Sequence, residues 1–208
     1  MIVKAKGHIA GGAISFATEL NFLESRVFRQ PVSQNLTTHL QRELRLDHAG
    51  ETGAVYIYKG IVAVAQWRGD VEMLNFAKAH GATEADHLSQ VEHWLPTTQR
   101  SLLLGPWRLA GWLTGALPAL FGRRAVFGTI AAVETFVDHH YQQQIDHLKA
   151  FGGPEGLLAL LIRCQADEQH HRDEALAFAG DQPSLVLRAW CWAVGWGSCV
   201  AVVLARRI

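Results

Sequence analysis

The chain has 208 residues, of which 49% are hydrophobic and 18% are charged, and its 19 lysines and arginines balance its 19 aspartates and glutamates. This composition excludes a disordered chain and is typical of one folded domain with a sizeable core. A formal net charge of zero lacks the excess of basic residues that binding to a phosphate backbone needs. We therefore expect no nucleic-acid partner.

The cysteines and the N-terminal residues indicate a reducing compartment. Cys164, Cys191 and Cys199 are odd in number and form no C-x-x-C pair, which argues against a disulfide scaffold or a thiolate zinc site. The first thirty residues mix charged residues such as Lys4 and Glu24 with apolar ones, without a continuous apolar stretch that ends in a cleavage site. We therefore expect no secretory signal and a place on the cytoplasmic side.

The predicted elements are all helical. Apolar residues recur at spacings of three and four through most of the chain, whereas alternating runs typical of strands are almost absent. The expected helices cover residues 35–68, 70–94, 123–150, 155–178 and 184–206, and an apolar segment interrupted by glycine and proline covers 101–122. Four long helices with short connections and one longer crossover are typical of a ferritin-like bundle.

Two helical segments carry Glu-x-x-His pairs, Glu84 with His87 and Glu168 with His171. Residues at i and i+3 share one face of a helix, so each pair can bind one metal ion, although a single pair also arises by chance. A glutamate in an apolar stretch precedes each pair at nearly the same distance: Glu51 lies 33 residues before Glu84, and Glu134 lies 34 before Glu168. This repeated arrangement predicts six ligands from four helices, as in carboxylate-bridged di-iron or di-manganese bundles.

The chemistry of these residues favours iron or manganese, because the predicted ligands are carboxylates and imidazoles without thiolates. We favour two iron ions per chain if the reaction uses oxygen. The alternative is a buried ion pair or a protonated acid in the core, which would bind no metal. On the metal interpretation, residues 35–208 form a single ferritin-like di-iron domain and residues 1–34 an N-terminal extension.

Further polar residues lie within one or two turns of the predicted ligands. We expect Asp47, and with it Asp138, His139 or His140, to hold the ligand histidines by their second ring nitrogen. Tyr58 and Tyr141 each follow a predicted ligand glutamate by seven residues. Both a redox role and ordinary packing in the core remain open for them. The remaining histidines are expected on the surface or in packing, namely His8, His39, His80, His93 and His147.

Two apolar stretches, residues 101–122 and 189–205, are rich in tryptophan. Pro106, Arg108 and Pro118 make the first stretch a poor membrane span, and the second has the minimum length for one. Tryptophans with arginines at the ends suit the headgroup region of a bilayer, so we expect both stretches to be membrane-interfacial helices in one leaflet. A buried core helix and a true span remain alternatives for the second stretch.

The ordered motifs of the chain resemble the demethoxyubiquinone hydroxylases of ubiquinone biosynthesis over about residues 40–207. The motifs are Leu46-Asp47-His48-Ala49-Gly50-Glu51, Glu84-Ala85-Asp86-His87-Leu88, Ala132-Val133-Glu134 with His139-His140-Tyr141, and Asp167-Glu168-Gln169-His170-His171. The resemblance implies the same six residues as di-iron ligands. The chain departs from the family at Thr52, where an aromatic residue is common, and at Thr135, where a second acid is common.

By this resemblance the chain hydroxylates the ring of a polyprenylated methoxy-methyl benzoquinol with O2. The apolar stretches and the lack of an evident secretory signal lead us to expect a peripheral protein on the cytoplasmic side of the cell membrane. The resemblance and the apolar stretches together imply a lipophilic quinol substrate, the membrane surface and other ubiquinone-biosynthesis proteins as partners. A ferritin-like or rubrerythrin-like iron store or peroxidase would use the same ligands, because fold and ligands do not determine function. The apolar stretches argue against such a store, whose outer face would be charged. A purely structural bundle with buried acids is the third hypothesis.

Overall fold

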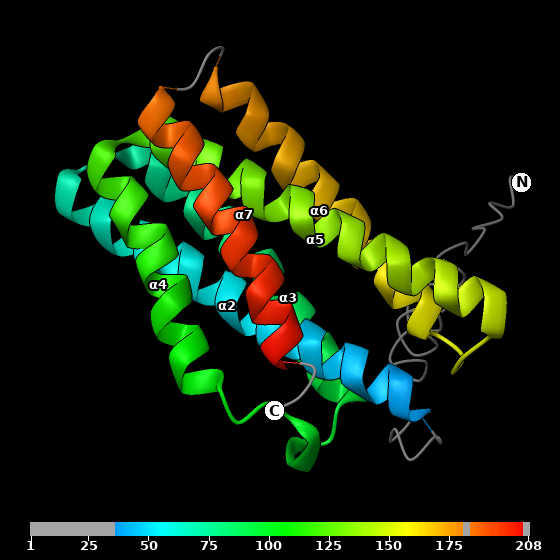
Figure 1. Ribbon diagram of the computed structural model, residues 1–208. Coiled ribbons are helices and arrows are strands. Elements are labelled where there is room, and N and C mark those ends of the chain that lie inside the picture. The colour runs from blue at the N-terminus through cyan, green and yellow to red at the C-terminus, as the bar shows by residue number, and fades with distance from the viewer. Residues whose placement is uncertain (1–35, 181–183, 206–208) are drawn as a thin grey trace, which may run out of the picture. The chain divides into compact units, whose positions relative to one another are not determined.

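The computed structural model describes residues 36–180 and 184–205, which are entirely helical and contain no strand (Figure 1). The elements are α2 (Thr38–Arg68), α3 (Val71–Trp94), the short 3₁₀ helix η1 (Thr97–Gln99), α4 (Leu104–Phe121), α5 (Arg123–Phe151), α6 (Leu157–Ala179) and α7 (Leu185–Ala205). The all-α prediction is therefore confirmed, and the helices begin and end within three residues of the expected positions. The N-terminal extension predicted at 1–34, with His8, lies outside the described residues.

The sharp turn between α2 and α3 follows from three adjacent residues. Gly69 adopts the left-handed conformation at φ 66°, which closes α2 with a hydrogen bond from its backbone N–H. Asp70 then begins α3, because its carboxylate accepts the backbone N–H of Met73 at 3.1 Å. The same carboxylate accepts the guanidinium of Arg123 at 2.8 Å, which joins the start of α3 to the start of α5.

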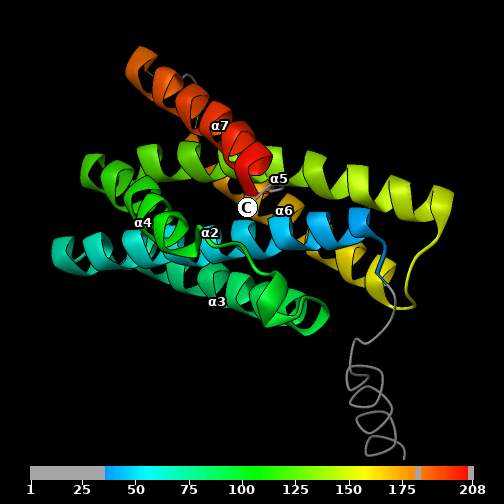
Figure 2. The same ribbon diagram turned by 60° about the horizontal axis from the view of Figure 1, so that its bottom comes forward.

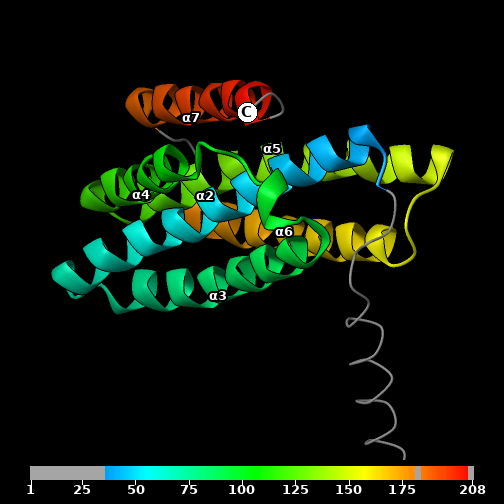
Figure 3. The same cartoon turned by 90° about the horizontal axis from the view of Figure 1, so that it is seen from below.

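Two helix pairs form the bundle, α2 with α3 and α5 with α6 (Figure 2). Helix α4, which belongs to the crossover between the two pairs, packs on α2 and α5. Helix α7 packs mainly on α5, and Figure 3 shows α7 on the side of the bundle opposite α3 and α6. The four-helix bundle is thus covered on one side by α4 and α7, the two apolar stretches of the sequence.

The contact between α2 and α4 is close because glycines lie at the crossing. A Cβ atom on Gly115 would be 1.9 Å from the carbonyl oxygen of Ile57, and one on Gly111 would be 2.4 Å from that of Gly53. Pro106 lies in the first turn of α4, where its missing N–H has no helical partner to lose. Helix α4 therefore begins before Pro106 and continues to Phe121, with Pro118 in its last turn.

Two apolar clusters fill the bundle on either side of its middle. One is built around Tyr58, Phe76 and Phe127, and the other around Leu44 and Leu161. Polar residues are buried in the region between them. Among the helices in the described residues, none is both long and apolar enough to cross a membrane.

Candidate metal centre and adjoining cavity

The structure brings the six predicted ligands together in the middle of the bundle. Each side chain is buried, and together they come from α2, α3, α5 and α6: Glu51, Glu84, His87, Glu134, Glu168 and His171. They fall into two groups of four, and within each group one ligand atom per residue lies within 4.8 Å of the others. Glu84 and Glu168 belong to both groups, the position that bridging carboxylates would occupy.

Several polar atoms at this point have no hydrogen-bond partner. Nδ1 of His171 lies 3.0 Å from Oε1 of Glu84 and 3.4 Å from Oε2 of Glu168, yet none of the three atoms is hydrogen-bonded. Oε2 of Glu51 is also buried without a partner. Buried polar atoms are normally satisfied, and carboxylate oxygens and an imidazole nitrogen that converge without hydrogen bonds suit a cation. The residues present therefore fit a site for metal ions.

The charges of the cluster lead to the same conclusion. Burial and the neighbouring Glu168 raise the pKa of Glu51 to about 7, and burial with Glu168 also raises the pKa of Glu84 and of Glu134. Burial alone would raise the pKa of Glu168, but contacts with His171 and His87 lower it to about 2. Four carboxylates packed together cannot all ionise without positive charge nearby. Divalent cations would supply that charge.

Two tyrosines connect the helix pairs across the cluster. Tyr58 on α2 donates its hydroxyl to Oε1 of Glu134 on α5 at 3.3 Å, and Tyr141 on α5 donates to Oε1 of Glu51 on α2. Both rings are buried. Each hydroxyl thus binds a ligand of the opposite pair, so the two tyrosines hold the glutamates as well as packing the core.

The prediction that Asp47, Asp138, His139 or His140 holds a ligand histidine is wrong. Oδ1 of Asp47 lies 3.2 Å from Nε2 of His140 and accepts Nε2 of Gln144 at 2.6 Å. Asp138 accepts Arg172, and Nδ1 of His139 contacts the carbonyl oxygen of Thr135. Asp47 lies one turn before Glu51, and the other three lie one or two turns after Glu134. Asp47, Asp138 and His140 nevertheless contact other helices, and His139 its own, which spacing alone does not determine.

The contacts that do reach the ligand histidines were not predicted. Oδ2 of Asp167 lies 3.0 Å from Nε2 of His87. His80, expected only as a surface or packing residue, is buried with its ring centroid 4.2 Å from that of His171, edge to face. Its Nε2 lies 2.9 Å from Oε2 of Glu174. Asp167 directly precedes Glu168, but only the packing of α6 against α3 shows which way it points.

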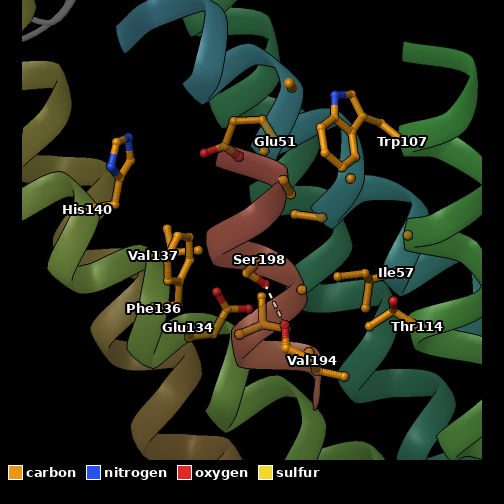
Figure 4. Close-up of a pocket in the computed structure, with 18 of the residues that line it drawn as sticks. Glu51, Ile57, Trp107, Thr114, Glu134, Phe136, Val137, His140, Val194 and Ser198 are labelled. Atoms are coloured by element: carbon orange, nitrogen blue, oxygen red, sulfur yellow. Dashed lines mark hydrogen bonds between the residues drawn. The ribbon is translucent and has the colours of Figure 1, made fainter. Parts of the chain in front are cut away.

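A cavity of about 410 Å³ adjoins the cluster. Five carboxylate residues belong to its wall: Asp47 and the four predicted ligand glutamates, Glu51, Glu84, Glu134 and Glu168. The rest is mainly apolar and comes from α2, α4, α5 and α7; in the view of Figure 4, Glu51 and Glu134 lie across from Trp107 and Ile57. The cavity is therefore charged at the ligand cluster and apolar elsewhere.

The two departures from the resembled family lie outside the cavity wall. Thr52 donates its hydroxyl to the carbonyl oxygen of His48 at 2.7 Å, and Thr135 donates to that of Ala131 at 2.6 Å. Both hydroxyls bond within their own helices, and neither residue is among those that line the cavity. Their effect on the shape of the cavity is thus indirect at most.

Fold and site together define a ferritin-like helical bundle with a buried carboxylate and histidine cluster suited to metal ions. Residues 38–205 match the family of the ubiquinone biosynthesis protein COQ7, and the chain belongs to this family. It is 32% identical over 183 residues to the 3-demethoxyubiquinol 3-hydroxylase of Rhodospirillum rubrum, covering 86% of this chain and 84% of the relative. It is 30% identical over 177 residues to the NADPH-dependent 3-demethoxyubiquinone 3-hydroxylase of Caenorhabditis elegans, covering 81% and 90%.

Proposed function

We propose that this chain is a 3-demethoxyubiquinol 3-hydroxylase that holds two iron ions on Glu51, Glu84, His87, Glu134, Glu168 and His171. Membership of the COQ7 family and the names of its relatives support this reaction. The observation that carries the proposal is that all four ligand glutamates belong to the wall of a mainly apolar cavity. An iron store has no need of an apolar chamber beside its metal cluster.

The reaction replaces one ring C–H bond by C–OH, and the second atom of O2 leaves as water. It therefore consumes two electrons and two protons. We assign both electrons and one proton to a reduced nicotinamide, because the worm relative is named as NADPH-dependent, and the second proton to solvent. When bound, the two iron ions supply the activation of O2. The chain holds the ring near the cluster, while apolar side chains such as Ile57, Trp107 and Val194 exclude water from it.

The polar residues of the wall have separate tasks in this proposal. His140 lines the cavity, where its imidazole can hydrogen-bond a ring hydroxyl, and Asp47 holds that imidazole from the side. Tyr141 keeps Oε1 of Glu51 engaged, so this carboxylate approaches an ion through Oε2, its unpartnered atom. The isoprenoid tail would lie along the small residues of α7, such as Gly197 and Ala201.

A labelled-oxygen experiment tests the reaction. Protein loaded with ferrous iron is supplied with a short-tailed demethoxyubiquinol, NADPH and ¹⁸O₂, and the product is followed by mass spectrometry. We expect a product with one labelled oxygen atom. Two bound irons without labelled product would favour the peroxidase or storage hypothesis, and a protein that binds no metal would favour the structural one.

We also propose that the outer side of α4 and α7 lies on a membrane surface at the cytoplasmic side. Trp192 and Trp196 on α7 are 72% and 62% exposed, which excludes a wholly buried helix, and Trp112 on α4 is 38% exposed. Exposed tryptophans on apolar helices are typical of a bilayer interface. Because the same two helices line the cavity, a quinol in the bilayer would lie near its binding place.

Vesicle binding tests this surface. Flotation with phosphatidylcholine and phosphatidylglycerol vesicles should show several-fold less bound protein for a Trp192→Ser, Trp196→Ser double variant than for the wild type. Trp67→Ser is the matched control, because Trp67 is 77% exposed but lies at the end of α2. Equal binding of all three proteins, or equal loss in both variants, would exclude α7 as the specific contact.

A further inference from the structure

The two Glu-x-x-His pairs are surrounded differently. Nε2 of His87, the nitrogen on the far side of the ring from the cluster, lies 3.0 Å from Oδ2 of Asp167. The ring of His171 instead packs edge to face against His80. The sequence shows the same inequality, because the residue before Glu168 is Asp167 whereas the residue before Glu84 is the uncharged Thr83.

When Nδ1 of His87 binds a metal ion, the contact with Asp167 holds the remaining ring proton on Nε2. Nδ1 faces the cluster, 3.1 Å from Oε1 of Glu168 and 3.8 Å from Oε2 of Glu51. A carboxylate at Nε2 accepts a hydrogen bond from the N–H there, which leaves the lone pair on Nδ1 free for a metal ion. Such partners orient a ligand imidazole and increase its donor strength. The side chain of His87 is 1% exposed and that of Asp167 is 43% exposed, so Asp167 reaches the buried ring from the surface of α6.

We propose that Asp167 is a positioning residue for His87, and that the metal position served by His87 therefore binds its ion more tightly than the one served by His171. The inference rests on the proposed metal centre. Outer partners of this kind change metal affinity by about 10–100-fold. Loading of the two positions then occurs in sequence, with the group of Glu51, Glu84, His87 and Glu168 filled first.

Metal titration without turnover tests the proposal. Metal-free protein is titrated anaerobically with Co²⁺, and bound ion per chain and d–d absorption are followed at equilibrium. We expect two unequal dissociation constants for the wild type. In Asp167→Asn, which keeps the shape of the side chain, the lower constant should rise by about 10–100-fold while the other stays the same.

The control is Asp86→Asn. Asp86 is exposed, directly precedes His87 and hydrogen-bonds Gln90, so the substitution removes the same charge without touching the imidazole. It should titrate like the wild type, and Asp167→Glu should recover part of the lost affinity. An equal change in Asp86→Asn and Asp167→Asn would mean that only net charge matters and would overturn the proposal.

A double-variant cycle shows whether Asp167 acts through His87. If it does, Asp167→Asn should change no constant further in a His87→Ala background, because the effect of interacting residues is not additive. Full additivity, or two equal constants in the wild type, would reject the positioning role while leaving the di-metal centre intact. A wild-type protein that binds no Co²⁺, Fe²⁺ or Mn²⁺ would instead reject the proposed function and this inference together.

Discussion

The cavity has a charged side on the four bundle helices and an apolar side on α4 and α7. On the charged side, buried carboxylates crowd together and their pKa values are shifted by burial and by one another. On the apolar side, glycines and alanines make room and no charge is present. The residues of the charged side are thus suited to binding metal ions, whereas those of the apolar side are suited to leaving room for a substrate.

This difference implies that the two sides fail in different ways. Loss of a ligand on the charged side should remove metal and activity but leave the bundle folded, because the apolar clusters on either side remain. A change on the apolar side should alter packing or substrate affinity while the metal stays bound. Variants of either side therefore test whether the two are independent.

The largest effect is expected at the charged side. Glu134→Ala should abolish ring hydroxylation and reduce the bound iron below two ions per chain, with helical content by circular dichroism largely unchanged. The reason is that Glu134 belongs to the group with Glu84, Glu168 and His171. Glu51→Ala should behave in the same way. Glu155→Ala, at an exposed position, is the control, and an active Glu134→Ala enzyme would contradict the ligand assignment.

The apolar side is most sensitive where α4 crosses α2. In Gly115→Ala the new Cβ would lie 1.9 Å from the carbonyl oxygen of Ile57, so the helices must separate. We expect a loss of about 1–3 kcal/mol in the free energy of unfolding, typical of overpacking. Denaturant unfolding measures it. Gly105→Ala, on the same helix with open space around the new atom, should be neutral or slightly stabilising; equal results for both would show that the crossing tolerates wider spacing.

The charged side could be predicted from the sequence because ligands impose a regular pattern. Glu-x-x-His places two groups on one face of a helix, and the repeated distance from Glu51 to Glu84 and from Glu134 to Glu168 indicates that the faces meet. Apolar periodicity and glycine turns likewise predicted the helices. These signals are local, or repeat at a fixed interval, so no three-dimensional information was needed to see them.

Contacts between helices could not be predicted in this way. Asp47 was assigned to a ligand histidine, but it lies beside His140 and Gln144, and the contact to His87 comes from Asp167 on another helix. Such pairing depends on the rotation of each helix about its axis. The spacing of residues within one helix does not indicate that rotation. The cavity depends on the same packing, and so on the close crossing at Gly111 and Gly115.

The smallest effect is expected from narrowing the cavity at α7. Gly197 lines the cavity and a Cβ there would meet nothing within 4 Å, so the Cβ of Gly197→Val is accommodated and its side chain takes up space in the cavity. The added methyl groups take the place of substrate, and we expect KM for the quinol to rise by about 10-fold, the size of a pocket mismatch of one or two methyl groups. Iron content and the free energy of unfolding should not change, because no ligand or core contact is altered.

Gly195→Val separates this steric effect from any general effect of valine on α7. Gly195 also has open space around it, but it is not among the residues that line the cavity. The KM of the Gly195→Val variant for the quinol should therefore equal that of the wild type. If Gly195→Val and Gly197→Val raised KM equally, a general change in α7 rather than a narrower cavity would explain the higher KM. The apolar side would then affect substrate binding through the packing of α7 on α5 and not through the space it encloses.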